Sequence, residues 1–326
     1  MKRRPLGKTG RQVSEIGLGC WQFSDDFGRM NDQTAAAIMS AAVESGTDFF
    51  DTADVYGDGR SETWIGEFRR TTGKPSFIAT KFGRGGGVYP DHYTEAALRR
   101  STEAALKRLG VEALDLLQLH CIPTEIMQAG VIFEWLRKLK AAGKIKQFGA
   151  SVETVDQALM CLEVDGCASL QIIFNLFRQK PIEALFPKVR ERGVGIIVRL
   201  PLASGLLAGK FTTSTRFGET DHRNYNRDGQ SFNVGETFAG LPFEKGVELA
   251  DGLKPLVPPG MTMAEMSLRW ILDYKEVSVI IPGASSPLQA RGNVRASDLP
   301  PLAAPLHEQL SAYYRERVHS AIRGPY

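Results

Sequence analysis

The sequence predicts an α/β protein in which eight strand–helix units close into a (β/α)8 TIM barrel. Short β-branched or aromatic runs alternate with longer stretches of helical periodicity, and this alternation repeats eight times in 326 residues. The composition does not change between units, so we expect a single domain over residues 1–326. A doubly wound sheet is the rival fold, but it should carry GxGxxG directly after a strand. Neither GLGC at 17–20 nor the glycine triplet at 85–87 completes that fingerprint.

The strands are predicted from short apolar runs that end in polar residues. They are expected at 15–23, 47–52, 76–81, 115–120, 145–151, 169–175, 194–200 and 277–283. The helices that follow them are expected at 31–46, 61–71, 92–109, 126–142, 154–163, 182–192, 262–273 and 287–295. Asn31 or Asp32 can cap the first helix, and Gly46, Gly143 and Gly193 mark helix ends.

The chain is longer than the roughly 250 residues that a barrel needs, and three segments account for the surplus. They are an N-terminal β-hairpin at 3–14, a long loop after the seventh strand, and an extra C-terminal helix near 305–322. Residues 203–240 within that loop, called the cover segment below, are rich in Gly, Thr, Asn and Arg. Because ordinary connections are far shorter, we expect a mobile cover over a binding site.

Charge and cysteine content exclude several classes of protein. The chain carries 40 Lys and Arg against 37 Asp and Glu, a net charge of +3, which gives no electrostatic footprint for nucleic acid or an anionic membrane. No apolar run follows the basic N-terminus as in a secretory signal, and none has the length of a membrane span. Cys20, Cys121, Cys161 and Cys167 lack metal-site spacing, so we expect reduced thiols, no metal and a cytoplasmic location.

Side chains at the carboxyl ends of barrel strands face the active site, and four of them form a chemical set. Asp51 ends the second predicted strand, and Tyr56 follows shortly after it. Lys81 ends the third strand and His120 ends the fourth. Because these strands are neighbours in a barrel, we expect the four side chains to converge on one small volume.

That set suits the reduction of a carbonyl group. A nearby ammonium would favour the phenolate of Tyr56 and lower its pKa, and a paired carboxylate would keep the ammonium charged. A neutral imidazole can donate a hydrogen bond to a carbonyl oxygen. The set holds no hydride, so a nicotinamide cofactor is implied. Taken singly, each residue equally fits a structural role, as an ion pair, a core histidine or a turn tyrosine; their joint position favours catalysis.

The motifs around these residues resemble the aldo-keto reductase superfamily, in particular its bacterial and potassium-channel-β-like branches. The matching segments are DTADVYGDGRSETWIGE, IATKFG, LDLLQLH, PLASGLLAGK and IPGASSPLQARGN, and the similarity runs from residue 3 to about 296. The resemblance implies reduction of an aldehyde or ketone with NADPH, or less often NADH. It assigns Tyr56 as general acid, Lys81 as the group that tunes its pKa, Asp51 as the partner of Lys81, and His120 as the residue that orients the carbonyl.

The resemblance also implies a cofactor site. The nicotinamide carboxamide would be held by Ser151 and Gln171. The pyrophosphate loop matches Leu202, Ser204, Gly205 and Leu207, and the adenosine end matches Gly283, Ser285, Gln289 and Asn293. Basic residues for a 2′-phosphate are few after the eighth strand, where Arg291 is the nearest cation, so NADPH is expected and NADH stays possible.

Two positions depart from the family pattern. Val152 stands where an asparagine usually follows Ser151, and Arg199 stands where an aromatic ring usually stacks on the nicotinamide. A buried arginine without a partner is costly, so we place Arg199 at the mouth of the site, against the cofactor or an oxygen-rich substrate. A structural salt bridge with a nearby carboxylate explains it equally well. Its neighbours Val198 and Leu200 should point to the other side of the strand.

The expected substrate is a small carbonyl compound, polar or sugar-like. The substrate pocket is expected to contain Trp21, Phe23, Tyr56, Phe82 and His120. Two alternative functions remain: a cofactor-binding regulatory subunit of a larger assembly, and a sugar dehydrogenase that works in the oxidative direction. The sequence leaves the oligomeric state open.

Overall fold

Eight parallel strands close into a barrel in the computed structural model, which describes residues 1–326. The sheet order is β10-β9-β8-β7-β6-β5-β4-β3. The strands are β3 (Leu18–Gly19), β4 (Phe49–Asp51), β5 (Phe77–Phe82), β6 (Leu114–His120), β7 (Ile145–Ser151), β8 (Cys167–Ile173), β9 (Gly195–Arg199) and β10 (Val277–Ile280). Parallel bridges from Ile16 to Ile280 and from Gly19 to Gly283 join the two edges. The predicted (β/α)8 barrel is therefore confirmed.

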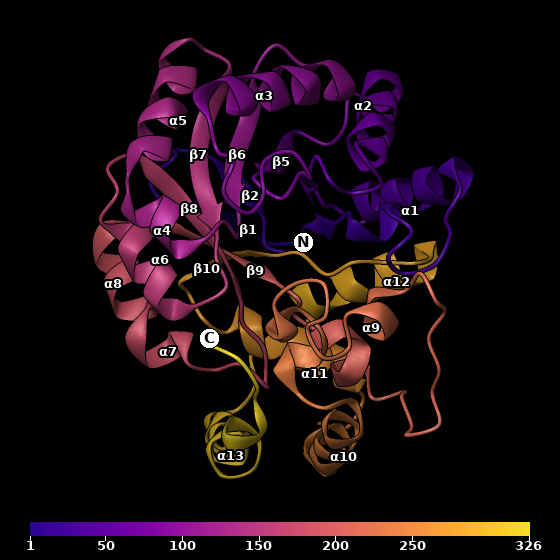
Figure 1. The fold of residues 1–326 in the computed structure, drawn as a ribbon. Coiled ribbons are helices and arrows are strands. Elements are labelled where there is room, and N and C mark those ends of the chain that lie inside the picture. Colours follow the sequence, from indigo (N-terminus) through magenta and orange to yellow (C-terminus); the bar gives the residue numbers. More distant parts are fainter.

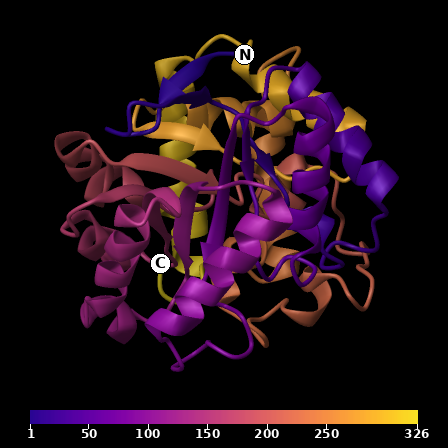
Figure 2. The same cartoon turned by 90° about the horizontal axis from the view of Figure 1, so that it is seen from above.

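Helices surround this sheet, and the strands run through the middle of the molecule (Figures 1 and 2). The main ones are α1 (Asp32–Glu44), α2 (Arg60–Thr72), α3 (Glu95–Leu109), α5 (Val131–Ala141), α6 (Val155–Leu162), α8 (Phe186–Arg192), α11 (Met263–Leu272) and α12 (Pro287–Val294). Two predicted helices are each divided, by the short helices α4 (Thr124–Gln128) and α7 (Pro181–Ala184). Gly130, with φ 75°, separates α4 from α5. Pro187 is the second residue of α8, where it cannot donate the hydrogen bond that would continue α7.

The first predicted strand is much shorter than expected. Only Leu18–Gly19 pair as a strand, and Trp21–Phe23 form a 3-10 turn, η1. An apolar run alone does not distinguish a strand from a buried turn.

The predicted N-terminal hairpin is present as β1 (Arg3–Pro5) and β2 (Gln12–Ser14), which pair antiparallel. Its Leu6 and Val13 are buried in a small core with barrel residues such as Phe49, Phe77 and Ile197. The hairpin therefore closes one end of the barrel and leaves the carboxyl ends of the strands for a site.

The predicted C-terminal helix is present with close to the expected bounds. The helix α13 (Ala304–Tyr313) continues as a π-helical turn and a 3-10 turn to Ala321. One helix, α10 (Phe243–Leu253), was not predicted; Phe243, Val247, Ala250 and Leu253 form its buried face. Both helices lie together at the lower end in Figure 1.

The cover segment folds into short pieces. These are η2 (Ala203–Ala208), α9 (His222–Tyr225), η3 (Val234–Glu236) and η4 (Phe238–Gly240). Phe217 and Phe238 pack on Phe243 of α10, with ring centroids 5.6 and 4.9 Å away, so the segment has an apolar anchor of its own.

Two further observations concern the chain as a whole. None of its helices combines the length and the apolar character that crossing a bilayer would take. The four cysteines are free thiols and all are buried.

Candidate active site

The structure brings Asp51, Tyr56 and Lys81 into hydrogen-bonding contact. Lys81 Nζ lies 2.5 Å from Asp51 Oδ1 and 3.4 Å from Tyr56 Oη, and it also donates to the carbonyl of Thr52 at 2.8 Å. Tyr56 is carried by a turn before α2, in which Gly57, Asp58 and Gly59 all have positive φ. Glycine adopts that conformation without strain, so the sequence of the turn permits its sharp return.

His120, the last residue of β6, completes the group. Its ring centroid lies 5.9 Å from that of Tyr56, with the planes at 83°. Its Nδ1 is buried and has no hydrogen-bond partner. The four residues singled out from the sequence therefore lie around one small volume, with Tyr56 Oη and the imidazole both available to a reacting group.

Two glutamines hold the Asp51 carboxylate from behind. Gln171 Nε2 donates to Asp51 Oδ2 at 2.7 Å and Gln118 Nε2 donates at 3.2 Å. Asp51 is thus fixed on both oxygens, and it fixes Lys81. Sequence reasoning missed Gln118, although the two-residue period of a strand places it on the same side of β6 as His120.

Burial sets the protonation of Tyr56. It raises the pKa of Tyr56 to about 12, which outweighs the lowering by the Lys81 ammonium. The expectation of a lowered phenol pKa is therefore wrong for this structure, because desolvation penalises the phenolate more than Lys81 stabilises it. Burial also opposes the charge of Lys81, but Asp51 and Tyr56 bring its pKa above the usual value. At neutral pH the pair is a neutral phenol beside a charged ammonium.

His120 is neutral as well. Burial, then the cations Arg84, Lys81 and Arg199, lower its pKa well below the usual value. A neutral imidazole has one N–H to donate and one nitrogen that accepts. The site can therefore present two hydrogen-bond donors, one from Tyr56 and one from His120, to the same acceptor oxygen.

A cavity of about 580 Å³ begins at this group and runs along the barrel mouth. Many of the residues proposed from the sequence line it: Trp21, Asp51, Tyr56, His120, Ser151, Gln171, Arg199, Leu202, Ser204, Gly205, Gly283, Ser285, Gln289 and Asn293. The cavity is thus one groove that contains both the group around Tyr56 and the hydroxyl and amide groups of Ser285, Gln289 and Asn293.

Apart from the buried Lys81, three of the proposed residues do not line this cavity. Phe23, Phe82 and Leu207 are at most 1% exposed and belong to the hydrophobic core. Phe23 packs edge-on against Trp64 and Phe82 against Tyr93. The expected pocket roles of Phe23 and Phe82, and the expected pyrophosphate contact of Leu207, are therefore corrected. Their apolar side chains point into the core, where burial is more favourable.

The cations available to a cofactor phosphate also differ from those expected. Arg291 pairs with Glu44 at 3.0 Å and does not line the cavity, whereas Lys210 and Arg295 do. A groove lined by polar donors and by the cations Arg199, Lys210, Arg223 and Arg295, which also contains Tyr56 and His120, fits an anionic dinucleotide cofactor. Nδ1 of His120 has no hydrogen-bond partner within the protein, which agrees with a ring that bonds to a ligand.

Arg199 both lines the cavity and pairs with a carboxylate. It is 8% exposed and lines the cavity, and its Nη1 lies 3.6 Å from Glu236. Its Nη2 donates to the carbonyl of Val152 at 3.1 Å. Leu200 also lines the cavity, contrary to the expected alternation, because the strand ends at Arg199 and Leu200 turns with φ 50°.

Arg84, Glu153, Arg199 and Glu236 form what we call the mouth cluster. Arg84 Nη2 lies 2.8 Å from Glu153 and 2.7 Å from Glu236. Although burial opposes its charge, Arg84 and Arg199 hold the pKa of Glu236 below the usual value. The cluster ties η3 of the cover segment to the loops after β5 and β7, and sequence reasoning did not find it.

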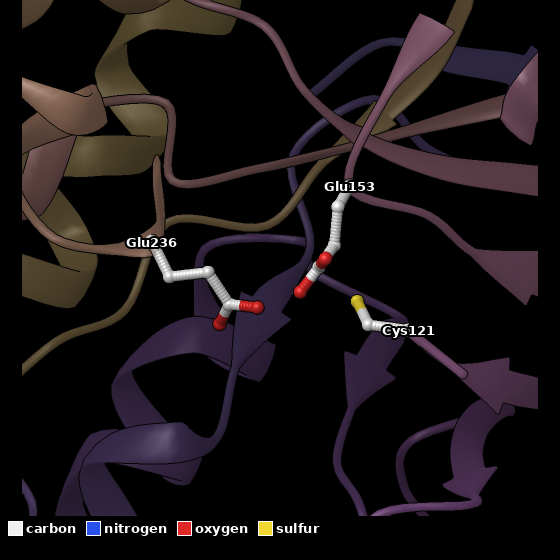
Figure 3. A group of neighbouring side chains, drawn as sticks. All are labelled: Cys121, Glu153 and Glu236. Carbon is white, nitrogen blue, oxygen red and sulfur yellow. The ribbon is translucent and has the colours of Figure 1, made fainter. Parts of the chain in front are cut away.

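Figure 3 shows that Glu153, Glu236 and Cys121 of the same region point toward one another. Their ligand-type atoms lie within 4.8 Å of each other. Arg84 already bonds to both carboxylates, so its guanidinium takes the place that a cation would need. The two carboxylates therefore form ion pairs with Arg84 and Arg199.

Comparisons with known proteins agree with this geometry. The model of the aldo/keto reductase family matches residues 15–314. A probable aldo-keto reductase of Glycine max is 29% identical over 86% of this chain and 80% of its own length. A probable voltage-gated potassium channel β subunit of Arabidopsis thaliana is 28% identical over 94% of each chain.

Solved structures show the same fold. The holo form of an aldo-keto reductase from Bacillus halodurans superposes with a TM-score of 0.78 at 25% identity, covering 100% of this chain and 98% of that one. The glycerol dehydrogenase of Gluconobacter oxydans superposes with a TM-score of 0.79 at 25% identity, over 99% and 98% of the two chains.

Proposed function

The chain belongs to the aldo/keto reductase family, and from this premise we propose that it is an NADPH-dependent oxidoreductase that reduces an aldehyde or ketone to an alcohol. The observation that carries the proposal is the contact of Lys81 with both Asp51 and Tyr56, beside a neutral His120, at one end of a long groove. Family membership already makes the chain an oxidoreductase that uses a nicotinamide cofactor and small carbonyl compounds. Our proposal adds three points: the reaction runs in the direction of reduction, NADPH is the preferred cofactor, and the named residues have the roles given below.

In the proposed reaction, the carbonyl oxygen accepts hydrogen bonds from Tyr56 Oη and from His120. A bound nicotinamide cofactor supplies the hydride for the carbonyl carbon. Tyr56 then gives its proton to the oxygen, on which negative charge develops. Lys81 stabilises the phenolate left behind, since its Nζ lies 3.4 Å from Tyr56 Oη. Asp51, held by Gln118 and Gln171, keeps Lys81 in that position.

The groove suggests how the cofactor is held. We assign Ser151 and Gln171 to the nicotinamide carboxamide, and Leu202, Ser204 and Gly205 to the pyrophosphate. The adenosine end would contact Gly283, Ser285, Gln289 and Asn293. Lys210 and Arg295, two of the cations that line the groove, favour the additional phosphate of NADPH over NADH.

Oxidation of a polyol or sugar is the second candidate. The likeness to a glycerol dehydrogenase favours it, because the same residues can work in reverse, with Tyr56 as the base. A regulatory role in a larger assembly is a third candidate, supported by the likeness to a probable channel β subunit. The intact group around Tyr56 favours catalysis over this binding-only role.

A substrate panel tests the proposal. Aldehydes, ketones and polyols are tested with each of the four nicotinamide cofactors, and turnover is followed by nicotinamide absorbance. We expect turnover of carbonyl compounds with NADPH to exceed the reverse reaction at neutral pH. Faster polyol oxidation would favour the second candidate, and cofactor binding without any turnover would favour the regulatory role.

A further inference from the structure

We propose that Arg199 makes this site distinguish the redox states of its cofactor, so that the reduced form binds more tightly than the oxidised form. The inference rests on the proposed function, because it requires a nicotinamide ring near Tyr56. It goes beyond the proposed function because it makes one side chain responsible for the difference in affinity between the reduced and the oxidised cofactor. Three observations lead to it: the place of Arg199, the weakness of its neutralisation, and the charges that reach His120.

The first observation is the place of Arg199. It is the last residue of β9, it lines the cavity, and it is only 8% exposed. Its Nη2 lies 3.6 Å from the sulfur of Cys121, the residue that follows His120 in the chain. Hydride transfer to a carbonyl held by Tyr56 and His120 requires the nicotinamide ring at the same end of the cavity. The ring would therefore lie within the field of this guanidinium.

The second observation is that Arg199 is poorly neutralised. Lys81 has Asp51 at 2.5 Å, and Arg84 lies within 2.8 Å of two carboxylates. Arg199 has only Glu236 at 3.6 Å, and that carboxylate is already bonded to Arg84.

The remaining charged groups near Arg199 do not correct this. Both carboxylate oxygens of Glu153 bond to other groups, Oε1 to Arg84 at 2.8 Å and Oε2 to Asn233 at 3.1 Å. Arg178, 2% exposed, brings another guanidinium, and its nearest partners are the carbonyl of Ala239 and the ring of Tyr326.

The third observation concerns the potential at the reacting group. After burial, the charges that lower the pKa of His120 are all cations: Arg84, Lys81 and Arg199. Arg199, which lines the cavity, therefore contributes positive charge at this position. A nicotinamide ring is neutral when reduced and positively charged when oxidised, so only the oxidised form is repelled. In a buried site such repulsion is much stronger than in water.

This repulsion has a use in the direction of reduction. The cofactor enters in the neutral-ring form and leaves in the charged-ring form. Because release of product limits turnover in many enzymes, weaker binding of the oxidised form shortens the cycle. An aromatic side chain at position 199 would pack against a ring without this discrimination.

Equilibrium titration of the full-length protein tests the inference. The dissociation constants of NADPH and of NADP+ are measured for the wild type, Arg199→Gln and Arg199→Lys. We expect Arg199→Gln to lower the ratio Kd(NADP+)/Kd(NADPH) about tenfold, mainly through tighter NADP+, the scale expected for one partly screened charge in a buried site. Arg199→Lys keeps the charge and should keep most of the ratio.

Glu236→Gln provides the opposite change. It removes the carboxylate that partly neutralises Arg199, so it should raise the same ratio. A merely structural role for Arg199 would not give shifts of opposite sign in the two variants. If Arg199→Gln does not fold, as judged by thermal melting, the result with Glu236→Gln decides.

Two results would overturn the inference: a ratio that stays the same in both variants, or equal weakening of both cofactor forms by Arg199→Gln. Failure of the proposed function would look different. In that case the wild-type protein would bind neither NADPH nor NADH, and no ratio could be measured.

Discussion

Burial, more than any single charged neighbour, sets the protonation of Tyr56 and His120, the residues proposed to react. Tyr56 stays a phenol and His120 stays neutral because water is excluded from both. The residue types and their strand ends could be read from the sequence, since parallel strands bring those ends together. The balance between desolvation and the Lys81 charge could not, because it depends on how tightly Tyr56 is packed. The sequence did not predict Gln118 and Glu236 as part of the site for a related reason, because their partners are distant in the sequence.

The Lys81–Asp51 pair makes separable contributions to stability and activity. Lys81→Met leaves Asp51 charged and buried, so we expect the free energy of unfolding to fall by about 3–5 kcal/mol, with a large loss of turnover. Adding Asp51→Asn removes the stranded charge and should restore much of the stability without restoring activity. Denaturant unfolding and steady-state rates of the wild type and the two variants measure this. Equal stability of the single and double variants would mean that the pair is not buried as described.

The depressed pKa of His120 predicts a flat acid limb. An ordinary histidine titrates near pH 6.5, so its protonation would change activity there. Because burial and three cations keep His120 neutral, we expect kcat/KM for carbonyl reduction to stay constant as the pH falls through about 6.5. A pH–rate profile with a group that titrates near that value, lost in His120→Gln, would contradict the assignment.

At the scale of elements, regular periodicity was the reliable signal. Every predicted strand–helix unit is present, because each amphipathic stretch had one face to bury. The misses lie where tertiary packing decides: η1 replaces the end of the first strand, and α10 forms because Phe243, Val247 and Leu253 cover part of the core. The mouth cluster that holds the cover segment was invisible in the sequence, since Arg84 and Glu236 are 152 residues apart.

The cover segment should respond to the cofactor. Its Ser204, Gly205, Lys210 and Glu236 line the cavity, so a bound cofactor would add contacts to it. We expect limited proteolysis within residues 203–240 to slow in the presence of NADPH. Arg84→Met removes the two ion pairs to Glu153 and Glu236, and cleavage without cofactor should then become faster. Identical cleavage rates with and without NADPH would contradict a cofactor-linked cover.

At the scale of the whole molecule, the barrel could be predicted because eight units leave few other ways to bury a parallel sheet. Its closure by the Ile16–Ile280 and Gly19–Gly283 bridges, and the plug made by the hairpin, then leave one open end. The site lies at that end, where the sequence placed it. Which of the proposed residues line the groove depended on side-chain packing, as Phe23 and Phe82 show.

Stability of the whole protein should fall in mild acid. Burial lowers the pKa of His222 to about 4 and that of His120 as well. In the unfolded chain both histidines bind protons below about pH 6.5, which the folded chain does not, so linkage lowers stability as the pH falls below that value. Thermal melting at constant ionic strength measures this. We expect His222→Gln to flatten the decline down to about pH 4, and an unchanged slope would contradict the burial of His222.

The most direct measurement of the central claim is single-turnover reduction by Tyr56→Phe with saturating NADPH. Only the proton donor is removed, so we predict a loss of about 10²–10⁴-fold in the rate, with the dissociation constant of NADPH within about twofold of the wild type. A rate close to that of the wild type, with cofactor binding intact, would show that Tyr56 is not the general acid.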